Sequence, residues 1–184
     1  MAGKDRYKKQ TEVRTIPDKP LTWMIICLLS LFASGCGVYS FTGASIPPEA
    51  ETISIGFIEN KADLVEPGLS QLFTDALRQR FSSQTNLVVI PRDGDLQMEG
   101  EIRKYDVRPE AIQGDETAAL NRLTIEVFIA YRNPYDESKN FEAAFSRFEN
   151  YSSNQDISAV KDALIESINS QLVDDIFNRA VVNW

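Results

Sequence analysis

Residues 123–132 read LTIEVFIAYR, and this stretch decides the fold. Apolar side chains stand at every second position, namely Leu123, Ile125, Val127, Ile129 and Tyr131. Successive side chains of a β-strand point to opposite faces, so this alternation predicts a strand with one buried face. A polar break at 133–136 (NPYD) is followed by a second alternating stretch at 141–151. Together the two stretches predict an antiparallel hairpin.

A further long strand is predicted upstream of this hairpin. It begins at Leu96, directly after the turn formed by residues 93–95 (DGD). Its apolar residues alternate regularly as far as residue 102 and then shift by one position, which indicates a β-bulge near Arg103 and Lys104. Pro109 is expected to end the strand because proline cannot donate to a ladder.

Elements at both ends of the domain complete the pattern. Residues 52–58 alternate as a strand that buries Ile53, Ile55 and Phe57, and residues 87–90 form a short apolar strand. Two amphipathic helices are predicted, one beginning near Pro67 and one reaching almost to Trp184. Asp156 or Ser158 is expected to cap the second helix. The inward stripes of the helices comprise Leu69, Leu72, Phe73, Ala76, Leu77 and Phe81, then Val160, Leu164, Ile165, Ile168, Leu172, Ile176 and Phe177.

This order of elements predicts an α+β domain. We expect a mostly antiparallel or mixed sheet of four strands, with both helices packed on one face. The expected boundaries are a signal peptide at 1–35, a lipidated tether at 36–50 and the folded domain at 51–184. The length of the last region suits one domain.

The N-terminus has the three parts of an export signal. A basic segment precedes an apolar run from Trp23 to Phe32, which is too short to span a bilayer. Small residues at 33–35 then lead to Cys36, the arrangement that a lipoprotein signal peptidase cleaves, although Ala33 stands where such signals usually carry leucine. Cys36 is therefore the predicted lipid-attachment residue. The alternative is an ordinary secretory signal with a chance cysteine.

The amino-acid composition argues against several classes of function. From Cys36 onward the chain has 13 basic and 24 acidic residues, a net charge of −11, which disfavours binding to nucleic acid. The chain has no histidine, so Ser-His, Cys-His and histidine-ligated metal sites are excluded. The segment 93–95 lacks the further ligands of an EF-hand, and we predict no metal, no cofactor and no enzymatic activity. A pair of carboxylates acting on envelope glycans is the remaining enzymatic alternative.

Two groups of side chains are candidates for ligand contact. Phe141, Phe145, Phe148 and Tyr151 are spaced for a strand, and we predict that they supply core, with a ligand-facing stripe as the alternative. The densest cationic cluster comprises Arg92, Arg103, Lys104 and Arg108. A solvated surface that balances nearby acidic residues is the competing interpretation of this cluster.

Several segments in order resemble one known family. They are residues 36–41 (CGVYSF), 46–48 (IPP), 53–55 (ISI), 69–77, 94–102 (GDLQMEGEI), 118–124 (AALNRLT) and 141–148. In this combination the chain resembles the lipopolysaccharide-assembly lipoproteins, the LptE-like family, over essentially the whole region after Cys36.

The resemblance implies a role in the outer membrane. It implies a lipid-anchored protein that faces the periplasm and plugs an LptD-like β-barrel translocon, helping it to assemble and to move lipopolysaccharide to the cell surface. It also implies lipopolysaccharide contacts, which we assign to Arg92, Arg103 and Lys104. A periplasmic adaptor or pilotin for another envelope machine is the alternative.

Overall fold

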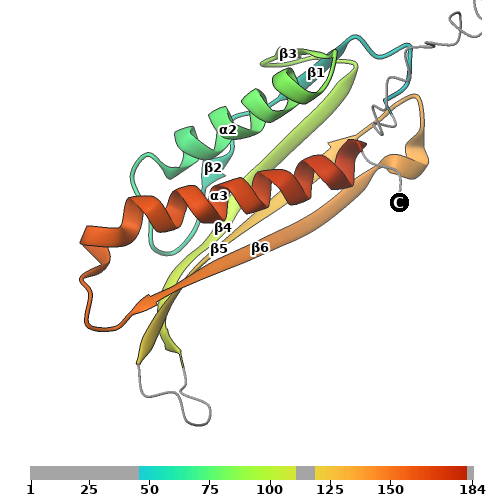
Figure 1. Cartoon of the computed structure of the whole chain (residues 1–184). Helices are drawn as coiled ribbons and strands as arrows, with labels where there is room; N and C mark the ends of the chain where they lie inside the picture. Colours follow the sequence, from blue (N-terminus) through green and yellow to red (C-terminus); the bar gives the residue numbers. More distant parts are fainter. Residues whose placement is uncertain (1–45, 111–118, 182–184) are drawn as a thin grey trace, which may run out of the picture. The chain divides into compact units, whose positions relative to one another are not determined.

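A computed structural model describes residues 46–110 and 119–181 of the chain (Figure 1). Cys36, the predicted signal peptide and most of the predicted tether lie outside the described residues. The elements are β1 (Thr52–Ile55), β2 (Glu59–Asn60), α2 (Leu69–Gln84), β3 (Val88–Ile90), β4 (Leu96–Glu110), β5 (Leu120–Arg132), the short 3-10 helix η2 (Glu137–Lys139), β6 (Phe141–Ser152) and α3 (Ile157–Val181).

All strands of the described residues join one mixed sheet of six strands in the order β3-β1-β4-β5-β6, with β2 beside β4. The pairs β4/β5 and β5/β6 are antiparallel, which confirms the predicted hairpin, whereas β1 is parallel to both β3 and β4. The expected number of four strands was wrong. The two-residue β2 carries no sequence period of its own, and it pairs only where Glu59 and Asn60 pass Glu101 and Ile102.

Both helices cover the same face of the sheet, as predicted (Figure 1). Their apolar stripes and the inward side chains of the strands form one core, in which Phe73, Phe81 and Ile125 have no exposed surface. Close packing of this kind is the main contribution to stability. An ion pair at the surface also joins the layers, because the Arg147 guanidinium on β6 donates twice to the Asp175 carboxylate on α3, at 2.6 and 2.7 Å.

The end of β1 differs from the prediction. The strand ends at Ile55, and Phe57 is 52% exposed instead of buried. Side chains of α2 replace the expected ladder contacts there: Arg78 donates to the Ile55 carbonyl at 2.8 Å, and the Thr74 hydroxyl accepts from the Ile58 amide at 3.0 Å. The chain therefore turns after Ile55 and buries Ile58 instead.

Two further expectations need correction. Leu72 is 49% exposed, because it lies where α2 faces α3 and not the sheet. Pro109 does not end β4, which continues to Glu110. Proline is tolerated there because this part of β4 has β5 as its single ladder neighbour, as an edge strand does.

Two predicted local features are confirmed. The β4/β5 register shifts between Ile102 and Lys104, where the bulge was expected. Asp156 caps α3, since its carboxylate accepts from the Ser158 amide at 2.8 Å. The bulge determines which side chains of β4 face away from the helices.

Candidate functional site: the open face of the sheet

The candidate site is the sheet face opposite α2 and α3, which no helix of the described residues covers (Figure 1). We call it the open face and define it by the outward side chains of β4, β5 and β6, and we call the helix-packed side the covered face. The open face comprises Gln97, Glu99, Glu101, Arg103, Lys104, Asp106, Arg108, Glu110, Leu120, Arg122, Thr124, Glu126, Phe128, Ala130, Arg132, Glu142, Ala144, Ser146, Phe148, Asn150 and Ser152.

The bulge places basic residues on the open face. Without the extra residue, strict alternation would bring Tyr105 and Val107 outward and Lys104 inward. With it, Tyr105 is buried on the covered face, while Arg103 and Lys104 both come to the outer side. The same register shift thus keeps Tyr105 in the core and brings Lys104 to the open face beside Arg103.

Two arginines of the open face lie over aromatic rings. The Arg103 guanidinium lies 3.7 Å from the centre of the Phe128 ring, and that of Arg122 lies 3.9 Å from the centre of the Phe148 ring. Each such contact contributes about 0.5–1 kcal/mol at an exposed position. Both arginine side chains remain partly exposed, Arg103 at 43% and Arg122 at 31%.

Carboxylates balance these cations. Glu101 accepts from Arg103 at 2.8 Å and lies 3.1 Å from Lys61, and these hydrogen bonds keep the pKa of Glu101 below its usual range. The pKa of Lys61 is raised in turn, chiefly by its hydrogen bond to Glu101. Arg122 is balanced similarly by Glu110 at 3.1 Å.

Lys104 belongs to a neighbouring cluster. Asp106 lies 2.6 Å from Arg108 and 4.0 Å from Lys104. These residues and Arg103 line a hollow of about 240 Å³, and Leu64, which is 57% exposed, lies at its margin. Three basic side chains, the carboxylates of Asp63 and Asp106 and an exposed apolar side chain therefore meet at one place.

The charge of the open face is close to neutral. It carries five basic and six acidic side chains, whereas the chain from Cys36 onward has a net charge of −11. The open face therefore repels an anionic ligand far less than the rest of the protein does. The cations of the cluster on this face are balanced by acidic side chains, as the solvated-surface interpretation expects, and ligand contact stays a prediction.

Arg92 lies apart from the other predicted contact residues. It follows β3 and lines a different hollow, of about 360 Å³, together with Phe57, Pro91 and Asp93. The structure thus brings Arg103 and Lys104 together and leaves Arg92 at a separate place. A role for each of the three in ligand contact stays a prediction.

Sequence reasoning missed part of the open face. The four aromatic residues at 141–151 were predicted to supply core, but Phe148 is 48% exposed on the open face, while Phe141, Phe145 and Tyr151 face the helices. The signal was available in the spacing, because Phe148 stands an odd number of residues from the other three. Arg122 and Phe128 were also missed, although both stand at polar positions of the clearest strand.

No three His, Cys, Asp or Glu side chains among residues 46–110 and 119–181 are grouped to hold a metal ion. Neither helix in this part of the chain combines the length and the apolar composition that a membrane span requires. The open face offers guanidinium groups, carboxylates and two aromatic rings for contact with a partner.

Fold and site together define a class: an α+β domain with two helices on one face of a mixed sheet and a polar, arginine-bearing face on the other side. The family identified as LptE, lipopolysaccharide-assembly, matches residues 50–180, which is well over half of the chain. The chain belongs to this family. Membership associates it with the assembly of lipopolysaccharide in the cell envelope and confirms the resemblance found in the sequence.

Solved structures of similar proteins include three from bacteria. A putative neuraminyllactose-binding hemagglutinin homologue from Helicobacter pylori is 11% identical, with 76% of this chain and 88% of that chain covered and a TM-score of 0.48. A Xanthomonas campestris protein is 11% identical (73% and 88% covered, TM-score 0.45), and a minor lipoprotein from Acinetobacter baumannii is 9% identical (68% and 97% covered, TM-score 0.41). No curated protein matches the chain. At these identities and TM-scores, nothing that these proteins bind is transferred to this chain.

Proposed function

We propose that this protein is a non-enzymatic outer-membrane lipoprotein, anchored through Cys36 and facing the periplasm. In this role it plugs an LptD-like β-barrel translocon, helps it to assemble and supports the transport of lipopolysaccharide to the cell surface. The observation that carries the proposal is the match to the lipopolysaccharide-assembly family over residues 50–180.

The anchor and the surface both suit this role. Two or three acyl chains on Cys36 would hold the protein firmly, whereas one chain gives marginal binding. The open face, near neutral and uncovered by the described helices, offers a broad polar surface to the interior wall of a barrel. Side chains of this kind fit a polar lumen better than they fit lipid.

We propose that lipopolysaccharide contacts the chain through Arg103 and Lys104. A planar guanidinium held against Phe128 can donate two parallel hydrogen bonds to a phosphate. On binding, the phosphate replaces the Glu101 carboxylate as the partner of Arg103, so no additional charge has to be buried. Leu64, at the margin of the same hollow, would contact an acyl chain.

Affinity capture tests the partner. The full chain carrying a C-terminal tag is captured from detergent-solubilised membranes, and a large outer-membrane barrel protein should co-purify in near-equal amount. A tagged, unrelated outer-membrane lipoprotein is the control. If no barrel protein is captured above this control, the plug role is refuted.

Depletion separates the proposal from the alternative. Loss of the chain should lower surface lipopolysaccharide, measured by labelling intact cells. Normal surface lipopolysaccharide together with a secretion or pilus defect would instead identify an adaptor or pilotin for another envelope machine.

Charge reversal tests the contacts. Arg103→Glu with Lys104→Glu should reduce the binding of purified lipopolysaccharide about tenfold or more, while Arg132→Glu is the matched control on the same face without a stacked ring. Arg92→Glu is measured separately because Arg92 lines another hollow. Equal binding by all variants would leave these residues as surface charge only.

The anchor has its own test. Mass spectrometry of the mature protein should find Cys36 as the first residue with a thioether-linked diacylglycerol. The variant Cys36→Ser should be left unlipidated and leave the membrane fraction. A mature N-terminus elsewhere would favour the ordinary secretory signal.

A further inference from the structure

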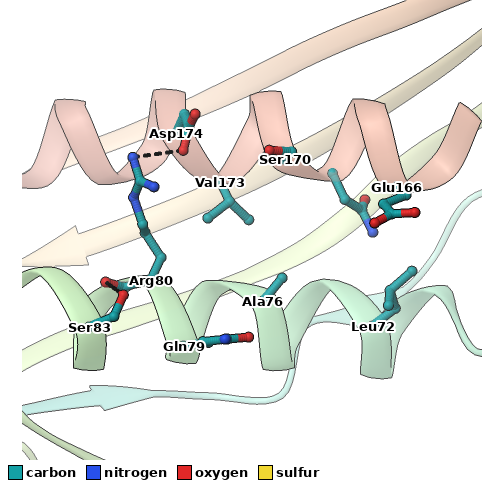
Figure 2. Close-up of a pocket in the computed structure, with 10 residues that line it drawn as sticks. Leu72, Ala76, Gln79, Arg80, Ser83, Glu166, Ser170, Val173 and Asp174 are labelled. Atoms are coloured by element: carbon teal, nitrogen blue, oxygen red, sulfur yellow. Dashed lines mark hydrogen bonds and ion pairs between the residues drawn. The ribbon is translucent and has the colours of Figure 1, made fainter. Parts of the chain in front are cut away.

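A second surface lies between the two helices. Leu72, Ala76 and Arg80 of α2 face Glu166, Ser170, Val173 and Asp174 of α3 across a groove of about 370 Å³ (Figure 2). The ion pair of Arg80 with Asp174, at 2.8 Å, closes one end, and Leu72 and Glu166 lie at the other. Between these ends lie the small or apolar side chains of Ala76, Ser170 and Val173.

The groove has an unusual polar residue in its lining, Asn169 of α3. Asn169 is 3% exposed, and neither its Oδ1 nor its Nδ2 has a hydrogen-bond partner among the described residues. The amide nitrogens of Asn60 and Asn133 are also unpaired, but their Oδ1 atoms accept backbone hydrogen bonds. A buried amide with both groups unpaired is costly to keep, and such a group calls for an explanation.

The chemistry of Asn169 matches a peptide group. Its carboxamide offers one acceptor and a donor side by side, and a peptide bond offers one N–H and one C=O. Arg80 adds a second donor, because its Nε is buried and unpaired in the same lining. Arg80 lies beside Asp174, which is five residues after Asn169 on α3, about 7.5 Å along the helix. Alternate residues of an extended chain are spaced similarly, by about 6.6 Å. One edge of an extended peptide can therefore reach both groups.

The shape of the groove and the charges of its lining further restrict the kind of ligand that it can bind. Asn169 lies at the floor of the groove, since it lines the groove yet is almost fully buried. An occupant that reaches it must be slim, as an extended backbone is. The lining has one basic and two acidic side chains, with Arg80 already paired to Asp174, while Glu166 has no ion pair among the described residues. Phosphate groups are disfavoured and a basic side chain is favoured.

We propose that the α2–α3 groove binds an extended, basic peptide segment of a partner protein. Asn169 and the Nε of Arg80 hydrogen-bond its backbone, Leu72 and Val173 contact an apolar side chain, and Glu166 pairs with a lysine or arginine. This surface is separate from the open face, and the proposal stands whether or not the barrel is the partner.

Photo-crosslinking in living cells tests the occupant. The full chain carries a photoreactive residue at position 72, or at position 71 as the control on the adjacent, groove-distal side. We expect a polypeptide adduct at position 72 at least tenfold stronger than at position 71, and mass spectrometry should map it to a short segment containing lysine or arginine. An adduct with lipid, with a second copy of this chain or with another segment of it would overturn the proposal, as would the absence of an adduct.

Two substitutions in the groove complete the test. Asn169→Leu should lower the adduct at least tenfold, while its melting temperature should equal or exceed that of the parent, because an unpaired amide is replaced by an apolar side chain. A synthetic peptide of the mapped segment should bind the purified full chain, and at least tenfold more weakly when Glu166→Lys is present. An unchanged adduct in folded Asn169→Leu, or unchanged peptide affinity in Glu166→Lys, would refute the proposed recognition.

Discussion

The covered face and the open face are formed by the same three long strands, whose side chains alternate between them. The covered face forms the core, whereas the open face forms the candidate binding surface. On β5 the covered face presents Leu123, Ile125 and Val127, which have no exposed surface. The intervening positions present Arg122 and Phe128, which form contacts at the open surface. One strand therefore supplies the core and the candidate binding surface at once.

The comparison teaches how this domain separates stability from recognition. Burial on the covered face provides the free energy of folding, so the open face needs no apolar surface to remain folded. Its arginines are free to exchange partners because their salt bridges are exposed and individually weak. Substitutions on the two faces should therefore differ sharply, and the following predictions test that difference in order of decreasing effect.

The largest effect is expected on the covered face. Phe73→Ala should lower the free energy of unfolding by about 3–5 kcal/mol, because it removes a fully buried ring and leaves a cavity. Urea unfolding followed by circular dichroism measures it. Leu72→Ala, one residue away and half-exposed, should cost less than about 1 kcal/mol. Equal losses of the free energy of unfolding in the two variants would contradict the expectation that burial on the covered face provides the stability.

A smaller loss is expected where the chain passes β1. Since β3 and β4 flank β1 and run parallel to it, the connection between them must cross β1, and Gly94 lies in that connection. An added Cβ at Gly94 would meet the backbone nitrogen of Ser54 and lie 2.8 Å from the Ile53 carbonyl carbon.

Gly94→Ala should therefore cost about 1–3 kcal/mol through steric strain. Gly56→Ala is the control, because the nearest atom to its Cβ lies 3.7 Å away, in ordinary contact. The same unfolding measurement applies, and a near-neutral Gly94→Ala would show that the crossing can relax.

The next effect depends on pH. Asp95 holds the start of β1, since its carboxylate accepts from the Thr52 hydroxyl at 2.7 Å and from the amides of Thr52 and Glu51 at 2.9 and 3.1 Å. These hydrogen bonds, led by the hydroxyl of Thr52, lower the pKa of Asp95 from its ordinary value of 3.8.

A carboxylate with a lowered pKa in the folded state stabilises fully above pH 3.8 and loses this contribution as the pH falls below 3.8. Asp95→Ala should therefore be less stable than the parent at pH 7, and the gap should narrow in acid. Thermal melts from pH 7 to pH 3 measure it, with Asp93→Ala as the control. A gap that is constant with pH would mean that the ionised carboxylate is not the cause.

The smallest effect on stability is expected on the open face. Arg103→Ala should change the free energy of unfolding by less than about 1 kcal/mol, because a stacked surface arginine contributes little. A double-mutant cycle with Phe128→Leu isolates the contact between them. A loss above about 2 kcal/mol would show that the open face is structural and would weaken its assignment to binding.

Much of this arrangement could be predicted from local patterns. Alternation in 123–132 identified the inner face of β5, the change of parity after residue 102 placed the bulge, and Asp156 was named as one of two caps of α3. These predictions succeeded because the period of a strand or helix and the geometry of a cap depend on neighbours within a few residues. The anchor at Cys36 rests on sequence alone, since it lies outside the described residues.

Other features depended on partners far away in the chain. The exposure of Phe57 follows from Arg78 and Thr74 of α2, and the pairing of β2 follows from where it meets β4. The groove lined by Asn169 exists because two helices about 90 residues apart lie side by side. None of these contacts produces a periodic pattern in the sequence from which it could be predicted.

The sequence by itself determined the class of fold, the family and most inward positions of the long elements, with Leu72 and Phe148 as exceptions, because hydrophobic residues recur with the period of each element. Only the tertiary structure decided that Arg103 lies on Phe128, that Arg122 lies on Phe148 and that Arg92 belongs elsewhere. The physical reason is that strand register and helix placement are set by the packing of the whole core, and short-range contacts between distant residues follow from that packing.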